Sequence, residues 1–294
     1  MEFNLDKIYM DSLQSIVIEL GAAVEGYPPA TLGRAIYAQI LHWLQLENSQ
    51  LSEQIHEAQA SPITVSGLLG NRRSGPTQPG DYFAMRVGLL NGNLLPILLR
   101  GIERCEMEPV ILGKFPFVLR RVYVLPNSHP LVSSSSYFSL SQAAAESDIQ
   151  LQFMSPTSFK QAAGIQTFPL PELVFGSLLR KWNCFAPEEL RFPEITWQGL
   201  VSAYELKTHA LKLEAGAEIG AQGWARYRFK DPDQAKLAAV LANFAFFAGV
   251  GRKTTMGMGQ VKLMLNSKVK RKKQKNDMPM PSEGEVILGD KDNE

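Results

Sequence analysis

A chain of 294 residues is long enough for two domains of ordinary size. Its hydrophobic fraction of 45% and charged fraction of 20% are typical of folded proteins and exclude a largely disordered chain. The net charge of +1 hides a charged tail, because residues 267–294 hold seven Lys or Arg and six Asp or Glu, which leaves 23 of each sign for the rest. Nucleic-acid binding therefore cannot rest on a general positive field and would need local basic patches.

The sequence indicates a cytoplasmic protein with no membrane partner. No apolar run is long enough to span a bilayer, and the first residues show no basic region followed by an apolar stretch. Cys105 and Cys184 lack a CxxC spacing, so in a reducing compartment we expect them to be packing residues. Four histidines without paired spacing argue against a structural zinc site, and we expect no cofactor.

The first half of the chain alternates between strand and helix patterns. The predicted strands are residues 13–24, 63–65, 82–87 and 110–125, and the predicted helices are residues 32–46, 51–59 and 93–102. Thr31 is the expected N-cap of the first helix, and Pro96 is expected in the first turn of the third. The order of strand, helix, strand, strand, helix and strand is the ferredoxin-like (βαββαβ) arrangement.

The second half repeats this order less clearly. Its predicted strands are residues 148–154, 203–213, 223–229 and 258–265, and its predicted helices are residues 173–182 and 233–248, with Asp231 or Asp233 near the start of the last helix. We therefore predict an α+β protein of two tandem ferredoxin-like domains. The serine run at 133–136 marks the boundary, which predicts domains at 1–130 and 131–266. The charged residues 267–294 read as a disordered tail.

Residues 249–259 (GVGRKTTMGMG) form the most distinctive segment, with four glycines in eleven positions between a predicted helix and the last strand. A dinucleotide-binding loop leads from strand to helix, and a P-loop would need GK[ST], so neither fits. Glycines allow positive φ angles and close approach of another backbone, while Arg252, Lys253, Thr254 and Thr255 offer charge and hydroxyls to phosphates. The alternative is a turn whose glycines only solve a packing problem.

Histidine is the side chain best suited to exchange protons near neutral pH. The chain has four, His42, His56, His129 and His209. A lone histidine is more often structural than catalytic, so residue type alone does not choose among them.

The chain resembles a known family in several segments. They are the glycine motif, residues 51–66 (LSEQIHEAQASPITVS), residues 153–159 (FMSPTSF), and residues 168–171 followed by 178–183. Together they resemble the CRISPR-associated endoribonucleases that process precursor CRISPR RNA. The resemblance implies a duplicated ferredoxin-like fold, repeat RNA as substrate and cleavage without a metal. It also implies attack by the RNA's own 2′-hydroxyl, which leaves a 2′,3′-cyclic phosphate.

The resemblance also implies site residues. His56 matches the histidine of the family's His-Glu segment and is the first catalytic candidate, with His42 next. Tyr37 lies near a first-helix position where some members carry a catalytic tyrosine or histidine. The lysine that some members carry after the His-Glu segment is absent here, so we expect Arg34, one helical turn before Tyr37, to supply the cation. The residues expected to bind RNA are Gly249, Gly251, Arg252, Lys253, Thr254, Gly257 and Gly259.

Two alternatives remain open at this point. A protein of the same fold could hold a repeat or guide RNA without cutting it, alone or in a CRISPR effector complex, because fold does not fix activity. An unrelated enzyme could use the glycine loop for a small phosphorylated ligand, although the helix-to-strand context of the loop argues against this.

Overall fold

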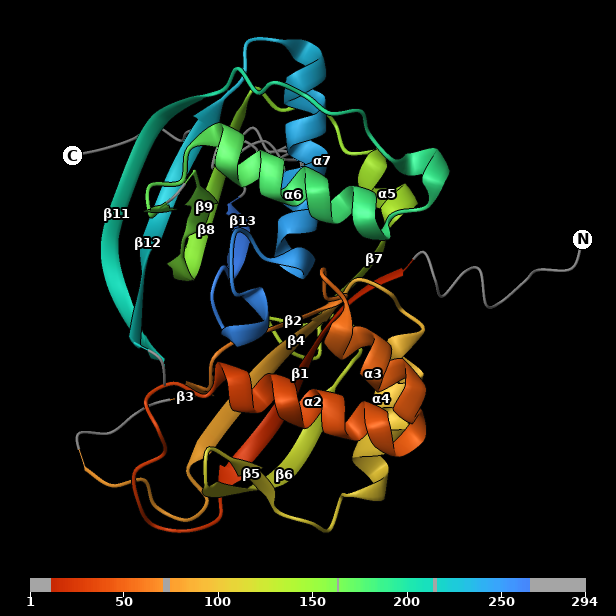
Figure 1. The fold of residues 1–294 in the computed structure, drawn as a ribbon, viewed down its shortest axis with the longest axis vertical. Coiled ribbons are helices and arrows are strands. Elements are labelled where there is room, and N and C mark those ends of the chain that lie inside the picture. Colours follow the sequence, from red (N-terminus) through yellow and green to blue (C-terminus); the bar gives the residue numbers. More distant parts are fainter. Residues whose placement is uncertain (1–11, 71–74, 163, 214–215, 265–294) are drawn as a thin grey trace, which may run out of the picture. The chain divides into compact units, whose positions relative to one another are not determined.

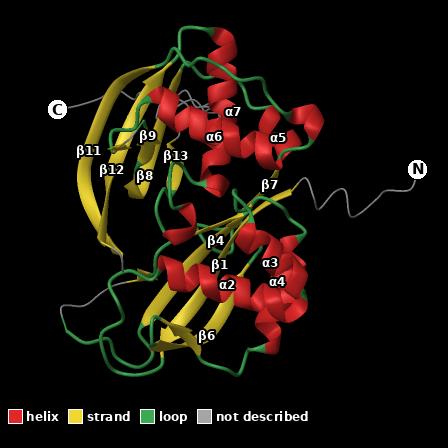
Figure 2. Ribbon diagram, in the orientation of Figure 1, coloured by secondary structure: helices red, strands yellow, loops and turns green. Residues whose placement is uncertain are grey.

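The computed structural model describes residues 12–70, 75–162, 164–213 and 216–264. They form two large antiparallel sheets, each with helices packed on one face (Figures 1 and 2), and a separate two-stranded sheet. The predicted tail at 267–294 and the end of the last predicted strand at Leu265 lie outside the described residues. No helix among the described residues is long and apolar enough to cross a membrane.

The N-terminal half has the predicted ferredoxin-like order. Its main elements are β1 (Ser12–Ala22), α2 (Gly33–Glu47), α3 (Ser49–Glu57), β2 (Ile63–Val65), β4 (Tyr82–Leu89), α4 (Leu94–Arg104) and β6 (Phe115–Tyr123). The strands lie in the order β2-β4-β1-β6-β5, where β5 is Val110–Leu112, and β3 (Leu69–Gly70) also pairs with β4. Alternate residues of β1, Ile16, Ile18 and Leu20, are buried in one cluster with Ile36 and Ile40 of α2, as the strand and helix periods require.

Two local predictions for this half were wrong. Residues 110–125 are not one strand but a hairpin of β5 (Val110–Leu112) and β6, because Gly113 and Lys114 both adopt positive φ angles, of 55° and 71°, and turn the chain. Thr31 is not an N-cap. Leu32 holds that position without a side-chain bond, and the Thr31 hydroxyl instead donates to the Lys212 carbonyl of a strand in the other half.

The C-terminal half repeats the arrangement. Its main elements are β8 (Asp148–Thr157), α6 (Pro171–Phe185), β11 (Leu200–Leu213), β12 (Gly216–Arg228), α7 (Pro232–Ala248) and β13 (Val261–Met264). The sheet order β11-β12-β8-β13 corresponds to β2-β4-β1-β6 of the first half, so the predicted pair of ferredoxin-like folds is confirmed. Asp231 is the N-cap of α7, and its carboxylate accepts from the Gln234 amide.

Shorter elements fill the connections. They are α5 (Tyr137–Ser141), β9 (Phe159–Gln161), β10 (Gly164–Gln166), and the 3₁₀ turns η1 (Glu188–Leu190) and η2 (Thr254–Met256). The serine run forms β7 (Ser133–Ser136), which pairs with the first residues of β1 and so belongs to the N-terminal sheet. A domain boundary at residue 130 stays a prediction.

The C-terminal end of α7 is capped by both halves of the chain. The last four carbonyls of a helix have no partner within it. Here the Ala245 carbonyl accepts from the Gly249 amide, the Phe246 carbonyl from Arg86 of β4, the Phe247 carbonyl from the Thr64 hydroxyl of β2, and the Ala248 carbonyl from the Lys181 ammonium of α6. Two of the four donors are cations, which the negative end of the helix dipole favours.

Arg86 is the larger of these caps and is only 1% exposed. Its guanidinium also donates to the Ser15 hydroxyl at 2.8 Å and to the Gln260 side chain, and it stacks over the Phe246 ring at 4.2 Å. Burial lowers the pKa of Arg86 to about 9, so the group stays charged at neutral pH. Gln260 in turn donates to the Val65 carbonyl, which fixes the start of β13 against β2.

We predict that Gly88→Ala weakens this junction. Gly88 lies on β4 where an added Cβ would stand 2.4 Å from both the Phe247 carbonyl oxygen and the Thr64 hydroxyl oxygen, so α7 and β4 must move apart. Chemical denaturation should show a loss of about 1–3 kcal/mol in the free energy of unfolding. The matched Gly75→Ala variant, with no atom within 4 Å of its new methyl group, should change stability by less than about 0.5 kcal/mol. Equal losses in both variants would contradict the close packing at Gly88.

Candidate active site

The glycine loop runs from the end of α7 to β13, and its four glycines all have positive φ angles. The space that they leave is taken by the protein itself. An added Cβ at Gly251 would lie 2.4 Å from the Ser158 carbonyl oxygen, and one at Gly257 would lie 2.8 Å from the Gly67 nitrogen. Gly249 and Gly259 likewise face loop atoms. These contacts support the packing explanation for the glycines, and their contact with RNA stays a prediction.

The second part of this loop packs against the N-terminal half. An added Cβ at Gly33, the first residue of α2, would lie 2.0 Å from the Met256 carbonyl oxygen, and Gly257 forms a parallel bridge with Ser66 just after β2. The loop is therefore held between the start of α2 and the end of β2. This contact brings the first helix of one half beside the loop and α6 of the other.

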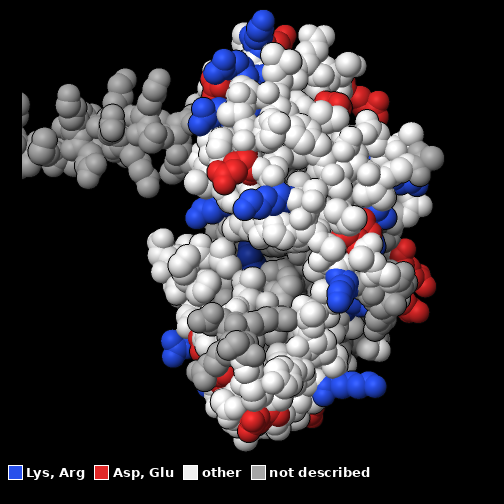
Figure 3. Space-filling view, turned by 90° about the vertical axis from the view of Figure 1, so that its left-hand side faces the viewer, with Lys and Arg blue, Asp and Glu red and all other residues white. Residues whose placement is uncertain are grey.

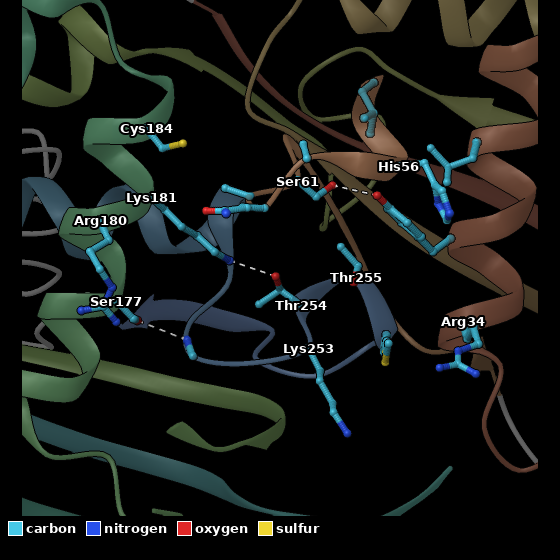
Figure 4. Close-up of a pocket in the computed structure, with 18 of the residues that line it drawn as sticks. Arg34, His56, Ser61, Ser177, Arg180, Lys181, Cys184, Lys253, Thr254 and Thr255 are labelled. Atoms are coloured by element: carbon cyan, nitrogen blue, oxygen red, sulfur yellow. Dashed lines mark hydrogen bonds between the residues drawn. The ribbon is translucent and has the colours of Figure 1, made fainter. Parts of the chain in front are cut away.

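A cavity of about 830 Å³ lies where these elements meet. Its polar side chains are Arg34 and Tyr37 of α2, His56 of α3, Gln59 and Ser61, then Ser177, Arg180, Lys181 and Cys184 of α6, and Lys253, Thr254 and Thr255 of the loop, which also contributes Gly251. Figure 4 shows His56 and Arg34 on one side, Lys181 and Arg180 on the other, and the Lys253–Thr255 segment between them.

The structure thus brings together most of the residues predicted from the sequence. Arg34, Tyr37 and His56 share the cavity with Gly251, Lys253 and Thr254, although about 200 residues of sequence separate the two sets. His42, the second catalytic candidate, does not join them, because it lines a separate cavity of about 190 Å³ beside Trp43 and Cys105.

Tyr37 is hydrogen-bonded to Ser61. Its Oη lies 3.0 Å from the Ser61 Oγ, and either hydroxyl can be the donor. When the Ser61 hydroxyl donates to the Ile63 carbonyl, 3.2 Å away, Tyr37 donates to Ser61. Burial raises the pKa of Tyr37 and outweighs the opposite effect of the Ser61 bond, so the phenol keeps its proton at neutral pH. Sequence reasoning noted only that the stretch around Ser61 has no lysine and gave Ser61 no role.

The two loop cations predicted to bind phosphate are paired with one carboxylate. Glu218 of β12 accepts from Arg252 Nη1 and from Lys253 Nζ, both at 2.7 Å, and from the Ser158 hydroxyl at 3.2 Å. Burial by itself raises the pKa of Glu218, but the Lys253 hydrogen bond and the two positive charges outweigh it, and the pKa is lowered. Arg252 is not among the residues that line the cavity. Glu218 could not be found from the sequence, because its pairing depends on the fold.

Lys181 is the third residue, after Ser61 and Glu218, that the sequence did not indicate. Its Nζ donates to the Ala248 carbonyl at 2.6 Å and to the Thr254 hydroxyl at 2.9 Å, a contact drawn in Figure 4. Burial lowers the pKa of Lys181 to about 7. No sequence pattern separates this lysine from a solvated one, because its burial comes from α7 and the loop.

Charge on the surface is mixed rather than of one sign. Figure 3 shows Lys and Arg side chains around the hollow near the middle of one face, with acidic side chains elsewhere on it. The neutral body predicted from composition agrees with this view. Among the described residues, no group of three or more His, Cys, Asp or Glu is placed to hold a metal ion.

We expect Glu218→Gln to lower the free energy of unfolding by about 1–3 kcal/mol at neutral pH, because it leaves Arg252 and Lys253 close together without their carboxylate. The pKa of Glu218 is lower in the folded protein than in the unfolded chain. The ionised carboxylate therefore stabilises the fold above the unfolded pKa, and this stability is lost as the pH falls through the folded pKa. The difference between wild type and variant in thermal unfolding should therefore shrink in acid. Glu205→Gln, at an exposed site on β11, is the control, and a difference that is independent of pH would refute the ion-pair explanation.

The chain is similar in sequence and in fold to known proteins. Residues 151–261 match the family model of the CRISPR-associated endoribonuclease Cas6. Relatives of that name from two strains of Mycobacterium tuberculosis are 30% identical over 119 residues, which cover 39% of this chain and 38% of theirs. A Streptococcus thermophilus Cas6 is 26% identical over 117 residues, which cover 38% of this chain and 48% of that protein. The match thus spans less than half the length of these relatives.

Solved structures match over more of the chain. A product complex of a Thermus thermophilus Cas6 has a TM-score of 0.74 at 25% identity and covers 86% of this chain and 100% of the other. A product complex of a second Cas6 has a TM-score of 0.68 at 28% identity, with the same coverage. The predicted resemblance is confirmed: in its fold and in the sequence of its C-terminal half, the chain is similar to CRISPR-associated endoribonucleases of the Cas6 family.

Proposed function

We propose that this chain is a metal-independent endoribonuclease that cuts repeat sequences in precursor CRISPR RNA. The observation that carries the proposal is the cavity, which joins a histidine, a tyrosine and several cations from both halves of a Cas6-type fold. Support also comes from the relatives, which are named as endoribonucleases and include product complexes. RNA is the proposed partner. A cytoplasmic location and a place in a CRISPR effector complex stay predictions.

The charge of the cavity suits an RNA backbone. Four of its lining residues are cations, Arg34, Arg180, Lys181 and Lys253, and none of the described lining residues is acidic. A phosphate that enters therefore meets positive charge without an opposing carboxylate. Lys253 can leave Glu218 for a phosphate, because its side chain is 25% exposed and lies at the cavity wall.

The proposed reaction is an internal transfer at one phosphate. The 2′-oxygen upstream of the cut attacks phosphorus and gives up its proton, while the bond from phosphorus to the 5′-oxygen breaks and that oxygen gains a proton. The products are a 2′,3′-cyclic phosphate and a free 5′-hydroxyl. The enzyme must move two protons and stabilise the charge that develops on the phosphate.

We assign these tasks to the N-terminal residues of the cavity. His56 takes the proton-transfer role, because imidazole exchanges protons near neutral pH. Tyr37 orients the reacting group as a donor, because its raised pKa keeps the phenol protonated at neutral pH and its hydroxyl can turn from Ser61 to the RNA. Arg34 is the charge-stabilising cation from α2, and the loop residues Lys253 and Thr254 bind the RNA backbone.

His56→Ala should lower the single-turnover cleavage rate of repeat RNA by about 10²-fold or more, because a proton-transfer group is lost. RNA affinity should change little. His42→Ala is the matched control, since it also removes a helical histidine but from the other cavity, and it should cut at the wild-type rate. If the two variants cut equally fast, His56 has no catalytic role.

The substrate tests the chemistry directly. A single 2′-deoxy substitution upstream of the cut should abolish cleavage while binding persists, because the nucleophile is gone. Wild-type cleavage should continue in EDTA and leave a cyclic phosphate on the upstream fragment, whereas a metal-activated water would need the ion and not the 2′-hydroxyl. Cleavage of the 2′-deoxy RNA, or strict dependence on added magnesium, would overturn the mechanism. Binding without any cleavage would favour the non-catalytic alternative.

A further inference from the structure

We propose that Lys181 is a phosphate-binding cation of the cavity, and that an RNA phosphate supplies the counter-charge that its ammonium lacks among the described residues of the free protein. This inference rests on the proposed function for the identity of the ligand. It does not rest on the assignment of His56, Tyr37 or Arg34.

Lys181 is placed where a ligand in the cavity can reach it. Lys181 and Arg86 both cap the end of α7, yet Arg86 is 1% exposed and does not line the cavity. Lys181 is only partly buried and does line it. A residue that only caps a helix needs no access to a cavity. The two cations therefore differ in accessibility to a ligand, which only Lys181 has.

The hydrogen-bond partners of the Lys181 ammonium leave one of its hydrogens for a ligand. A lysine ammonium has three hydrogens to donate. Ala248 and Thr254 accept two of them, and both acceptors are neutral oxygens. A third hydrogen therefore remains for a ligand oxygen. Desolvation in this setting lowers the pKa to about 7, which is how an ammonium without an anionic partner behaves.

The surroundings of Lys181 in the cavity contain cations but no carboxylate among the described lining residues. The charged or titratable side chains that share the cavity with Lys181 are Arg180 and Cys184 of α6, Lys253 of the loop, His56 of α3, and Arg34 and Tyr37 of α2. None of these is a carboxylate, so an incoming phosphate is the group that can favour the charged form of Lys181. RNA binding is then coupled to the uptake of a proton by Lys181.

The coupling predicts a pH dependence with a definite sign. Because the RNA-bound state holds more protons, affinity must fall as the pH rises above 7. The measurement is the dissociation constant of an uncleavable 2′-deoxy repeat RNA at constant salt, in a Cys184→Ser background that removes the cavity thiol. We expect affinity to drop roughly tenfold between about pH 7 and about pH 8.5, as one linked proton requires.

Two variants separate a ligand role from a cap role. Lys181→Met should weaken RNA binding at pH 7 by roughly tenfold or more and remove the pH dependence, because a charged donor is lost. Lys181→Arg keeps a cation that does not titrate in this range, so it should bind within a few-fold of wild type at pH 7 with a flat pH profile. If Lys181→Met does not fold, the pH profile of Lys181→Arg alone tests whether Lys181 titrates with RNA binding.

The outcomes are distinguishable. If the wild type neither binds nor cuts repeat RNA, the proposed function fails. If the wild type binds and cuts, but both variants keep its pH slope, Lys181 is only a helix cap and the inference is refuted. A lowered melting temperature in Lys181→Met with unchanged affinity would refute it in the same way.

Discussion

The junction of this protein depends on the last turn of α7. A helix end leaves four carbonyls to be satisfied, and burial forbids water as their partner. Here a loop amide, a hydroxyl and two cations fill those positions, and the hydroxyl and one of the cations come from the other half of the chain. The requirement to pair these carbonyls therefore fixes one ferredoxin-like half against the other. It also explains how a guanidinium can be buried without a carboxylate, since the helix dipole and the Phe246 ring face it.

The cavity follows from that junction. The chain that leaves α7 must turn at once towards β13, and the glycines of the loop allow it to pass between the Ser158 carbonyl and the end of β2. The loop contacts the first residue of α2 on its way, so the side chains of α2 and α3 come to face those of α6. The glycine motif thus contacts the N-terminal half and also lines the cavity. A substitution in it would be expected to change both stability and any activity.

Positive charge around the loop is only partly neutralised in the ligand-free protein. Arg252 and Lys253 share Glu218, and Lys181 has only neutral partners among the described residues. An RNA phosphate must compete with Glu218 for the first two, whereas at Lys181 it would compete with no carboxylate. A neutral body with cations concentrated at one cavity gives binding that depends on local geometry rather than on a long-range field.

The sequence by itself determined the order of the elements and pointed to the residues of the site. Period-two and helical patterns located β1, α2 and β8, because a half-buried strand or helix must show its period in the chain. The resemblance selected His56 over His42; the two histidines line separate cavities, and the choice between them stays a prediction. The patterns failed at Gly113 and Lys114, where an apolar run conceals a two-residue turn, and at Thr31, whose hydroxyl bonds to a distant strand.

Only the tertiary structure decided what depends on contacts between distant segments. Glu218 meets Arg252 and Lys253 because β12 lies beside the loop, and Lys181 is partly buried because its ammonium lies against the last carbonyl of α7. Neither contact leaves a pattern in the local sequence. A glutamate on a strand or a lysine on a helix has the same sequence neighbours whether its side chain is solvated or paired. The pairing of Arg86 with the end of α7 is of the same kind, with 160 residues between donor and acceptor. Local patterns record which face of an element is buried, but only the folded chain shows which charge is left without a counter-charge.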